Sequence, residues 1–139
     1  MESTEEIFFD KAMARYESGV EAIDLLEDFE SITATAPTQS AGWTCLAWLQ
    51  LLCNHNEEAL RSARKAVKLN RQDPQARINL SLALLETNSK GVREHIEFLQ
   101  KALFVVPDLK KELQNSIEDG LKRKPDWQAL KKIKNWLEF

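Results

Sequence analysis

Two apolar runs separated by a polar turn occupy residues 43–67, which read WTCLAWLQLLCNHNEEALRSARKAV. In the first run Trp43, Leu46 and Ala47 recur at steps of three and four residues, and alanines follow the same steps in the second run. This spacing places the apolar side chains on one face of an α-helix. Because Cys53-Asn54-His55-Asn56 between the runs favours a turn, we expect a helical hairpin here.

The same helical spacing continues along the chain, and no stretch alternates as a half-buried strand does. Turn residues interrupt it repeatedly, for example at Ser18-Gly19, Asp73-Pro74 and Lys124-Pro125-Asp126. These breaks predict about eight helices of roughly 12–17 residues, and the short loops make neighbouring helices pack antiparallel. We expect one all-α domain over residues 1–139, with hairpins at about 4–36, 39–70 and 73–106 and a C-terminal hairpin or cap at 108–139.

An internal repeat relates the second expected hairpin to the third. Shifting the sequence by 34 residues places Trp43 over Arg77, Leu46 over Leu80 and Ala47 over Ser81. Further on the shift grows to 36, and the two extra residues fit the turn near Asn88, where an insertion costs little. A period of this length is typical of stacked helical repeats.

The pattern resembles the tetratricopeptide repeat (TPR), in which a W-x2-L-G-x2-Y helix precedes a helix with small, bulky and small positions and a closing proline. The matching residues are Trp43, Leu46, Ala47, Ala59, Ala66, Leu80, Ser81, Leu84, Leu99, Ala102 and Pro107, and Ala63 stands at the bulky position. Residues that differ from the motif are Gln50, Ala63, Arg71, Arg77 and His95. The resemblance implies antiparallel hairpins stacked as a short right-handed superhelix with a C-terminal capping helix.

Charge is unevenly distributed over the 139 residues. Residues 1–36 hold ten acidic side chains against Lys11 and Arg15, a balance of −8, whereas the whole chain carries −3. A chain without a basic excess does not favour a nucleic-acid partner. With an acidic N-terminus, two cysteines and no apolar run of about 18 residues, we expect a reduced, cytoplasmic protein without membrane insertion.

Residues with catalytic or metal-binding chemistry are few and scattered. His55 and His95 lie 40 residues apart, outside any tight ligand motif, and no glycine-rich phosphate loop is present. Cys45 and Cys53 lie on one expected helix, about 12 Å apart along its axis, which is too far for a disulfide. We therefore expect no enzyme, no metal and no cofactor. A weaker alternative is an enzyme with a polar pocket around His55 or His95.

The TPR resemblance implies a non-catalytic protein-interaction module that binds a partner peptide or amphipathic helix in a concave, mostly apolar groove. The groove candidates are Thr44, Trp48, Leu51, Leu52, Ile78, Asn79, Leu82, Leu85, Lys111 and Asn115, with Gln114 beside them. Trp48 is the largest potential anchor. A clamp for a C-terminal carboxylate is incomplete, because Thr44, Trp48 and Asn115 stand where it needs other residues.

Two alternatives stay open at this point. Trp48 and its apolar neighbours could be covered by the terminal helices of the chain itself or by a second copy in a homodimer. A separate alternative is an RNA- or nucleotide-associated factor that uses a basic stripe within residues 61–71, although no aromatic residues interleave for base stacking. The stripe consists of Arg61, Arg64, Lys65, Lys68 and Arg71.

Overall fold

A computed structural model describes residues 3–139, which form eight α-helices and contain no strand. The helices are α1 (Thr4–Glu17), α2 (Ala22–Thr35), α3 (Ser40–Leu52), α4 (Asn56–Leu69), α5 (Pro74–Glu86), α6 (Val92–Val105), α7 (Leu109–Arg123) and α8 (Gln128–Trp136). The predicted all-α class is confirmed.

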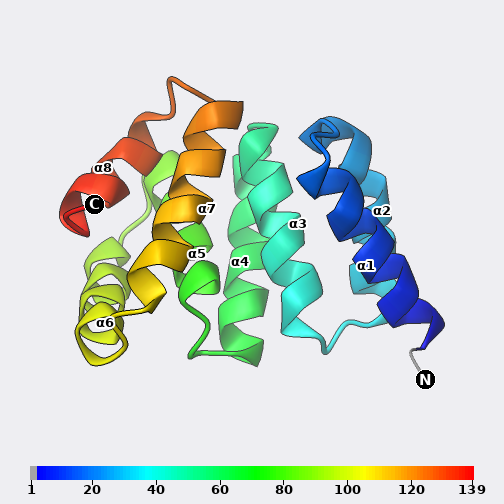
Figure 1. Ribbon diagram of the computed structural model, residues 1–139, viewed down its shortest axis with the longest axis horizontal. Coiled ribbons are helices and arrows are strands. Elements are labelled where there is room, and N and C mark those ends of the chain that lie inside the picture. Colours follow the sequence, from blue (N-terminus) through cyan, green and yellow to red (C-terminus); the bar gives the residue numbers. More distant parts are fainter. Residues whose placement is uncertain (1–2) are drawn as a thin grey trace.

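Consecutive helices form antiparallel hairpins that stand side by side (Figure 1). The α1–α2 hairpin lies at one end of the array, and α6 and α8 lie at the other. The α3–α4 hairpin lies in the middle and packs against both α2 and α5. Helix α7 crosses in front of α5, and α8 then packs against α5. The C-terminal segment therefore folds over one face of the array as well as closing its end.

Local sequence signals explain several helix boundaries. Ser3 caps α1 in a capping box, because its Oγ accepts from the Glu6 amide at 3.1 Å while the Glu6 carboxylate accepts from the Ser3 amide at 3.2 Å. Asp73 caps α5 by accepting from the Gln75 amide at 3.0 Å, and proline follows at the first helical position. Gly19, with φ of +99°, makes the turn between α1 and α2.

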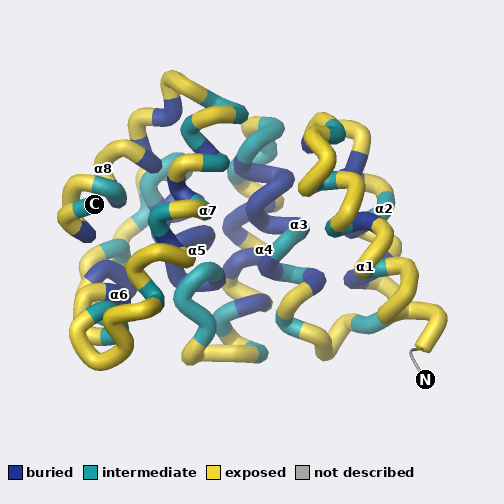
Figure 2. Tube along the Cα trace, in the orientation of Figure 1, coloured by how far each residue is buried: buried dark blue, intermediate teal, exposed yellow. Residues whose placement is uncertain are grey.

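The buried core has two parts that meet at α3. One part joins α1, α2 and α3 around Phe29, and the other runs from α3 to α8. Figure 2 shows the longest buried stretches on α3 and α5. Ala47, Ala59 and Ala66 have no exposed surface, so small side chains occupy the places where the paired helices approach most closely.

Three of the departures from the TPR motif, Gln50, Arg77 and His95, are buried polar residues with hydrogen-bond partners. Gln50 is buried, and its side-chain oxygen accepts from Ser62 Oγ at 2.8 Å. The Arg77 guanidinium donates twice to the Arg71 carbonyl, at 3.0 and 3.1 Å, and lies 3.0 Å from His95 Nδ1. These three buried polar side chains are thus tolerated because each has a hydrogen-bond partner.

Candidate functional site

Trp48, the expected anchor of the groove, lies beneath helices from both ends of the chain. Its side chain comes from the middle of α3 and only 8% of the residue is exposed. The indole Nε1 donates to Tyr16 Oη of α1 at 2.8 Å. Its ring packs on Trp127, just before α8, with 5.4 Å between centroids and 47° between planes. The sequence left open what covers Trp48, and in the structure the terminal segments of the chain itself cover it.

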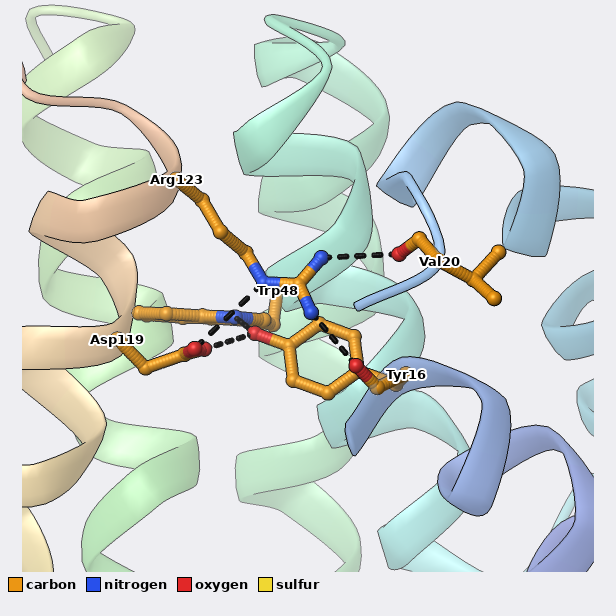
Figure 3. Close-up of polar contacts among 5 residues, drawn as sticks. All are labelled: Tyr16, Val20, Trp48, Asp119 and Arg123. Atoms are coloured by element: carbon orange, nitrogen blue, oxygen red, sulfur yellow. Dashed lines mark hydrogen bonds and ion pairs between the residues drawn. The ribbon is translucent and has the colours of Figure 1, made fainter. Parts of the chain in front are cut away.

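A polar clasp joins the end of α1 to α7 above Trp48 (Figure 3). The Tyr16 hydroxyl donates to the Asp119 carboxylate, and the Arg123 guanidinium lies 3.8 Å from the Tyr16 ring centroid. Arg123 also donates to the carbonyls of Tyr16 at 2.6 Å and of Val20 at 3.0 Å. Burial, and next the hydrogen bond with Asp119, raise the pKa of Tyr16 above its ordinary value, so the phenol is neutral at physiological pH.

The end of α7 is held a second time by Lys124. Its ammonium donates to the Leu51 carbonyl at 3.2 Å and to Asn54 Oδ1 at 2.6 Å, and it lies 3.9 Å from the Glu86 carboxylate. These contacts fix α7 to the C-terminal ends of α3 and α5. Burial lowers the pKa of Lys124, while the Glu86 carboxylate opposes that shift.

Gly120 permits the close approach of α7 to the array. A Cβ at this position would lie 2.7 Å from Leu130 Cδ2 and 2.8 Å from Trp48 Cη2. Non-bonded contacts this short essentially never occur at a Cβ atom, so any side chain here would displace α7, the Leu130 side chain or the indole. Gly120 therefore belongs to the same covering contact as Tyr16 and Trp127.

The other expected groove residues fall into two groups. Thr44, Leu51, Ile78, Asn79 and Leu82 are buried, and Leu52 and Leu85 are partly buried and pack against the core. Lys111 and Asn115 are exposed on α7, and Gln114 is partly exposed. Most of the apolar members thus fill the space between hairpins. That the set binds a partner stays a prediction, and only part of it borders open space.

The open space on this face lies nearer the N-terminal hairpin. A cleft of about 820 Å³ is lined by the first half of α1, the end of α2 and the start of α3. A second pocket, of about 230 Å³, follows along α1 and is bordered by Met13, Tyr16, Thr44, Trp48 and Asn79, among others. Three of the expected groove residues therefore line the inner pocket, whereas the larger cleft is formed by residues outside the expected set.

Comparisons with known proteins bear on this geometry. No protein-family model matches the chain, and no curated protein sequence matches it either. Among solved structures it resembles the type III secretion translocator chaperone SycD of Yersinia enterocolitica, in an alternative dimer, with a TM-score of 0.68 and 17% identity over 100% of this chain and 98% of that one. It also resembles the first TPR of Spaghetti (RPAP3) bound to the HSP90 peptide SRMEEVD, with a TM-score of 0.55 and 16% identity over 97% and 94% of the two chains. The chain has a TPR-like fold.

A further solved structure shows a TPR-like neighbour with a ligand. SycD of Yersinia enterocolitica in complex with a peptide of the translocator YopD matches with a TM-score of 0.59 and 15% identity, over 99% of this chain and 92% of that one. The TPR resemblance read from Trp43, Leu46 and the alanines of the second hairpin is therefore confirmed at the level of the fold.

The remaining candidate residues of this TPR-like chain lie outside the larger cleft, although Cys45 lines the inner pocket. His55 precedes α4, with Nδ1 3.4 Å from the Glu58 carboxylate, and His95 is buried in α6. Within residues 3–139, no three histidine, cysteine or acidic side chains cluster to hold a metal ion. Cys45 Sγ lies 3.6 Å from Met13 Sδ, and burial raises the pKa of its thiol to about 12. None of the described helices is both long and apolar enough to cross a membrane.

The basic stripe lies on the outer surface of this TPR-like array. All of its members are exposed: Arg61, Arg64, Lys65, Lys68 and Arg71. The first four belong to α4, which lies behind α3 in Figure 1 and so faces away from the α1 and α7 side. That these residues contact RNA or nucleotides stays a prediction.

Sequence reasoning missed the residues that form the clasp and the larger cleft. Tyr16, Asp119 and Arg123 are brought together from segments about a hundred residues apart, and no local pattern links them. One feature of the sequence did relate to the cleft. Acidic residues are concentrated in positions 1–36, and three of them, Glu5, Glu6 and Asp10, line the cleft.

Proposed function

We propose that the chain is a non-catalytic protein-interaction module that binds a peptide segment or an amphipathic helix of another protein on the face formed by α1, α3 and α7. The observation that carries this proposal is the open cleft of about 820 Å³ between α1, α2 and α3. Clefts of this size accommodate several side chains of a partner.

The composition of the cleft supports a protein ligand. Phe8 is 42% exposed at its wall, and Ile32 and Gly42 form part of its inner surface. An exposed aromatic ring beside an apolar surface is a feature of protein-binding sites, where such rings supply much of the binding energy. Two of the solved TPR-like structures hold peptides, one of YopD and one of HSP90, which supports the same class of ligand for this chain.

The inner pocket extends the proposed binding surface. Thr44 and Trp48, each 8% exposed, line it, so a bound segment that reaches beyond Phe9 along α1 would meet them. Asn79 also lines the pocket, but it has no exposed surface and is not proposed as a direct contact. Lys111 and Asn115 stay candidates for contacts from the exposed side of α7. The fully buried Leu51, Ile78 and Leu82 support the surface from below and are not proposed as direct contacts.

A photo-crosslinking amino acid placed at a single position tests the proposal. Ala41 is exposed and lines the cleft, whereas Ala14 is exposed on α1 outside both pockets and serves as the matched control. In cells that make the protein, position 41 should crosslink to a discrete protein and position 14 should not. The crosslink should disappear with Phe8→Ala. Equal crosslinking from both positions, or a product that Phe8→Ala leaves unchanged, would contradict the proposal.

A further inference from the structure

Three carboxylates line the cleft without any positively charged partner. Glu5, Glu6 and Asp10 lie along its α1 wall, and no lysine, arginine or histidine is among its lining residues. No ion pair among residues 3–139 involves any of the three. Glu6 accepts one hydrogen bond from the Ser3 amide, which leaves its charge uncompensated. The α1 wall therefore carries three negative charges.

The helix ends at the cleft do not offset this charge. Helix α2 ends there at Thr35 and has no basic residue in its last turn, so its carbonyl end adds partial negative charge. Helices α1 and α3 begin there and add partial positive charge. Each helix end is equivalent to roughly half an elementary charge, so the three ends together amount to about one half positive charge. The carboxylates outweigh them.

The rest of the cleft surface combines apolar side chains with uncharged polar ones, which are Ser3, Thr4, Ser31, Thr35 and Gln39. Phe8 stands exposed, and Phe9 packs edge-on against the buried Phe29 ring with 6.0 Å between centroids. Gly42 and Ile32 both line the inner surface, and they lie close together, since a Cβ on Gly42 would be 3.1 Å from Ile32 Cγ2. A ligand for this cleft therefore meets apolar side chains interspersed with uncharged polar groups, and carboxylates along the α1 wall.

We infer that the cleft selects a segment in which lysine or arginine side chains flank bulky apolar ones, and that it rejects acidic segments. This inference rests on the proposed function and names the chemical class of its partner. The cationic side chains pair with Glu5 and Asp10, while an apolar side chain packs on Phe8. The balance of −8 over residues 1–36 steers such a segment toward the N-terminal hairpin before contact.

Three fluorescent peptides of about 12 residues, roughly 18 Å long as helices, test the charge selection. They share the same leucine and phenylalanine positions and carry lysine, glutamine or glutamate at all the others. Binding to the full chain is followed by fluorescence anisotropy. The lysine peptide should bind about tenfold more tightly than the glutamine peptide, with the glutamate peptide weakest, and added salt should reduce these differences.

Matched variants locate the effect in the cleft. Glu5→Gln with Asp10→Asn removes two carboxylates at nearly constant shape, while Asp24→Asn with Glu27→Gln makes the same change of charge on the exposed side of α2, outside the cleft. The two substitutions in the cleft should lower the affinity for the lysine peptide about three- to tenfold and leave the affinity for the glutamine peptide unchanged. The two substitutions on α2 should change the affinity for either peptide by less than twofold. Circular dichroism melts check that each variant is folded.

The outcomes separate the inference from the proposed function. If all three peptides bind with equal affinity and Phe8→Ala weakens their binding, the cleft binds peptides without selecting for charge. The inference is then wrong, and the proposed function stands. If the α2 pair weakens the lysine peptide as much as the cleft pair, the attraction is a property of net charge, which also overturns the inference. If no peptide binds, or Phe8→Ala has no effect on any, both fail.

Discussion

The Arg77 guanidinium lies 3.0 Å from Nδ1 of His95 between α5 and α6. Because an arginine side chain only donates, Nδ1 must accept, and the imidazole is neutral with its proton on Nε2. Burial lowers the pKa of His95 below its ordinary value, and the positive charge of Arg77 lowers it further, while Glu94 opposes the shift. Protonation of His95 would place two positive charges in contact.

The fold should therefore lose stability in mild acid. A histidine whose pKa is depressed by folding contributes its full stabilisation above the unfolded pKa, about 6.5, and that stabilisation falls as the pH drops toward the folded pKa. We expect the urea midpoint to decrease between about pH 7.5 and pH 5.5. In His95→Gln, whose side-chain oxygen can still accept from Arg77, this decrease should be smaller. His55→Gln is the control and should keep the full decrease; identical profiles for the two variants would contradict the assignment.

Loss of the Tyr16 hydroxyl should loosen the clasp. Tyr16→Phe leaves the Trp48 Nε1 and the Asp119 carboxylate without this partner, at a cost of about 1–3 kcal/mol in the free energy of unfolding. Amide hydrogen exchange should rise in residues 109–123 more than in α4. Uniform exchange along the chain would show that the hydroxyl does not hold α7 in place.

The raised pKa of Tyr16 predicts that its phenol titrates at unusually alkaline pH in the folded protein. It is the chain's single tyrosine, so the phenolate absorbance reports on it alone. Folding raises its pKa above the ordinary value of 10.0, so its contribution to stability is complete below about pH 10 and is lost as the pH rises further. In the native protein the absorbance should titrate above this value, and in urea near it. A native midpoint at or below 10 would be inconsistent with the buried phenol.

Gly120→Ala should destabilise the chain although alanine favours helices. The added Cβ overlaps Leu130 and the Trp48 indole, and overpacking costs about 1–3 kcal/mol, more than the roughly 0.5–1 kcal/mol that alanine gains over glycine in a helix. Urea unfolding measures the difference. The cost should be smaller in a Trp48→Leu background, because the overlap with the indole is removed. A stabilised Gly120→Ala protein would mean that α7 does not approach α3 this closely.

The two cysteines should react with a thiol reagent at different rates. Burial raises the pKa of Cys45 to about 12 and also raises that of Cys53, whose thiol lies near the Lys124 ammonium that opposes the shift. At about pH 8 the reaction is faster at Cys53, because the thiolate is the reactive form. Cys53→Ser should remove the fast phase and Cys45→Ser should keep it. In urea both thiols should react at the same rate.

The sequence by itself determined the helices and their pairing, because these depend on local interactions. Apolar spacing over three to four residues, the Asp73-Pro74 start of α5 and the Ser18-Gly19 turn each act within a few residues. The small residues Ala47, Ala59 and Ala66 likewise indicated where helices approach, and all three are fully buried.

The tertiary structure alone decided what covers Trp48 and where the open cleft lies. The contact of Tyr16 with Asp119 joins residues 103 positions apart, and that of Arg123 with the Tyr16 carbonyl joins residues 107 apart. Helical periodicity assigns a face to each side chain, but it carries no information about which distant helix packs on that face. The position of Trp48 in the helical pattern is compatible with an open groove and with a covered one. The groove is covered because Gly120 has no side chain, which lets α7 pack against the indole.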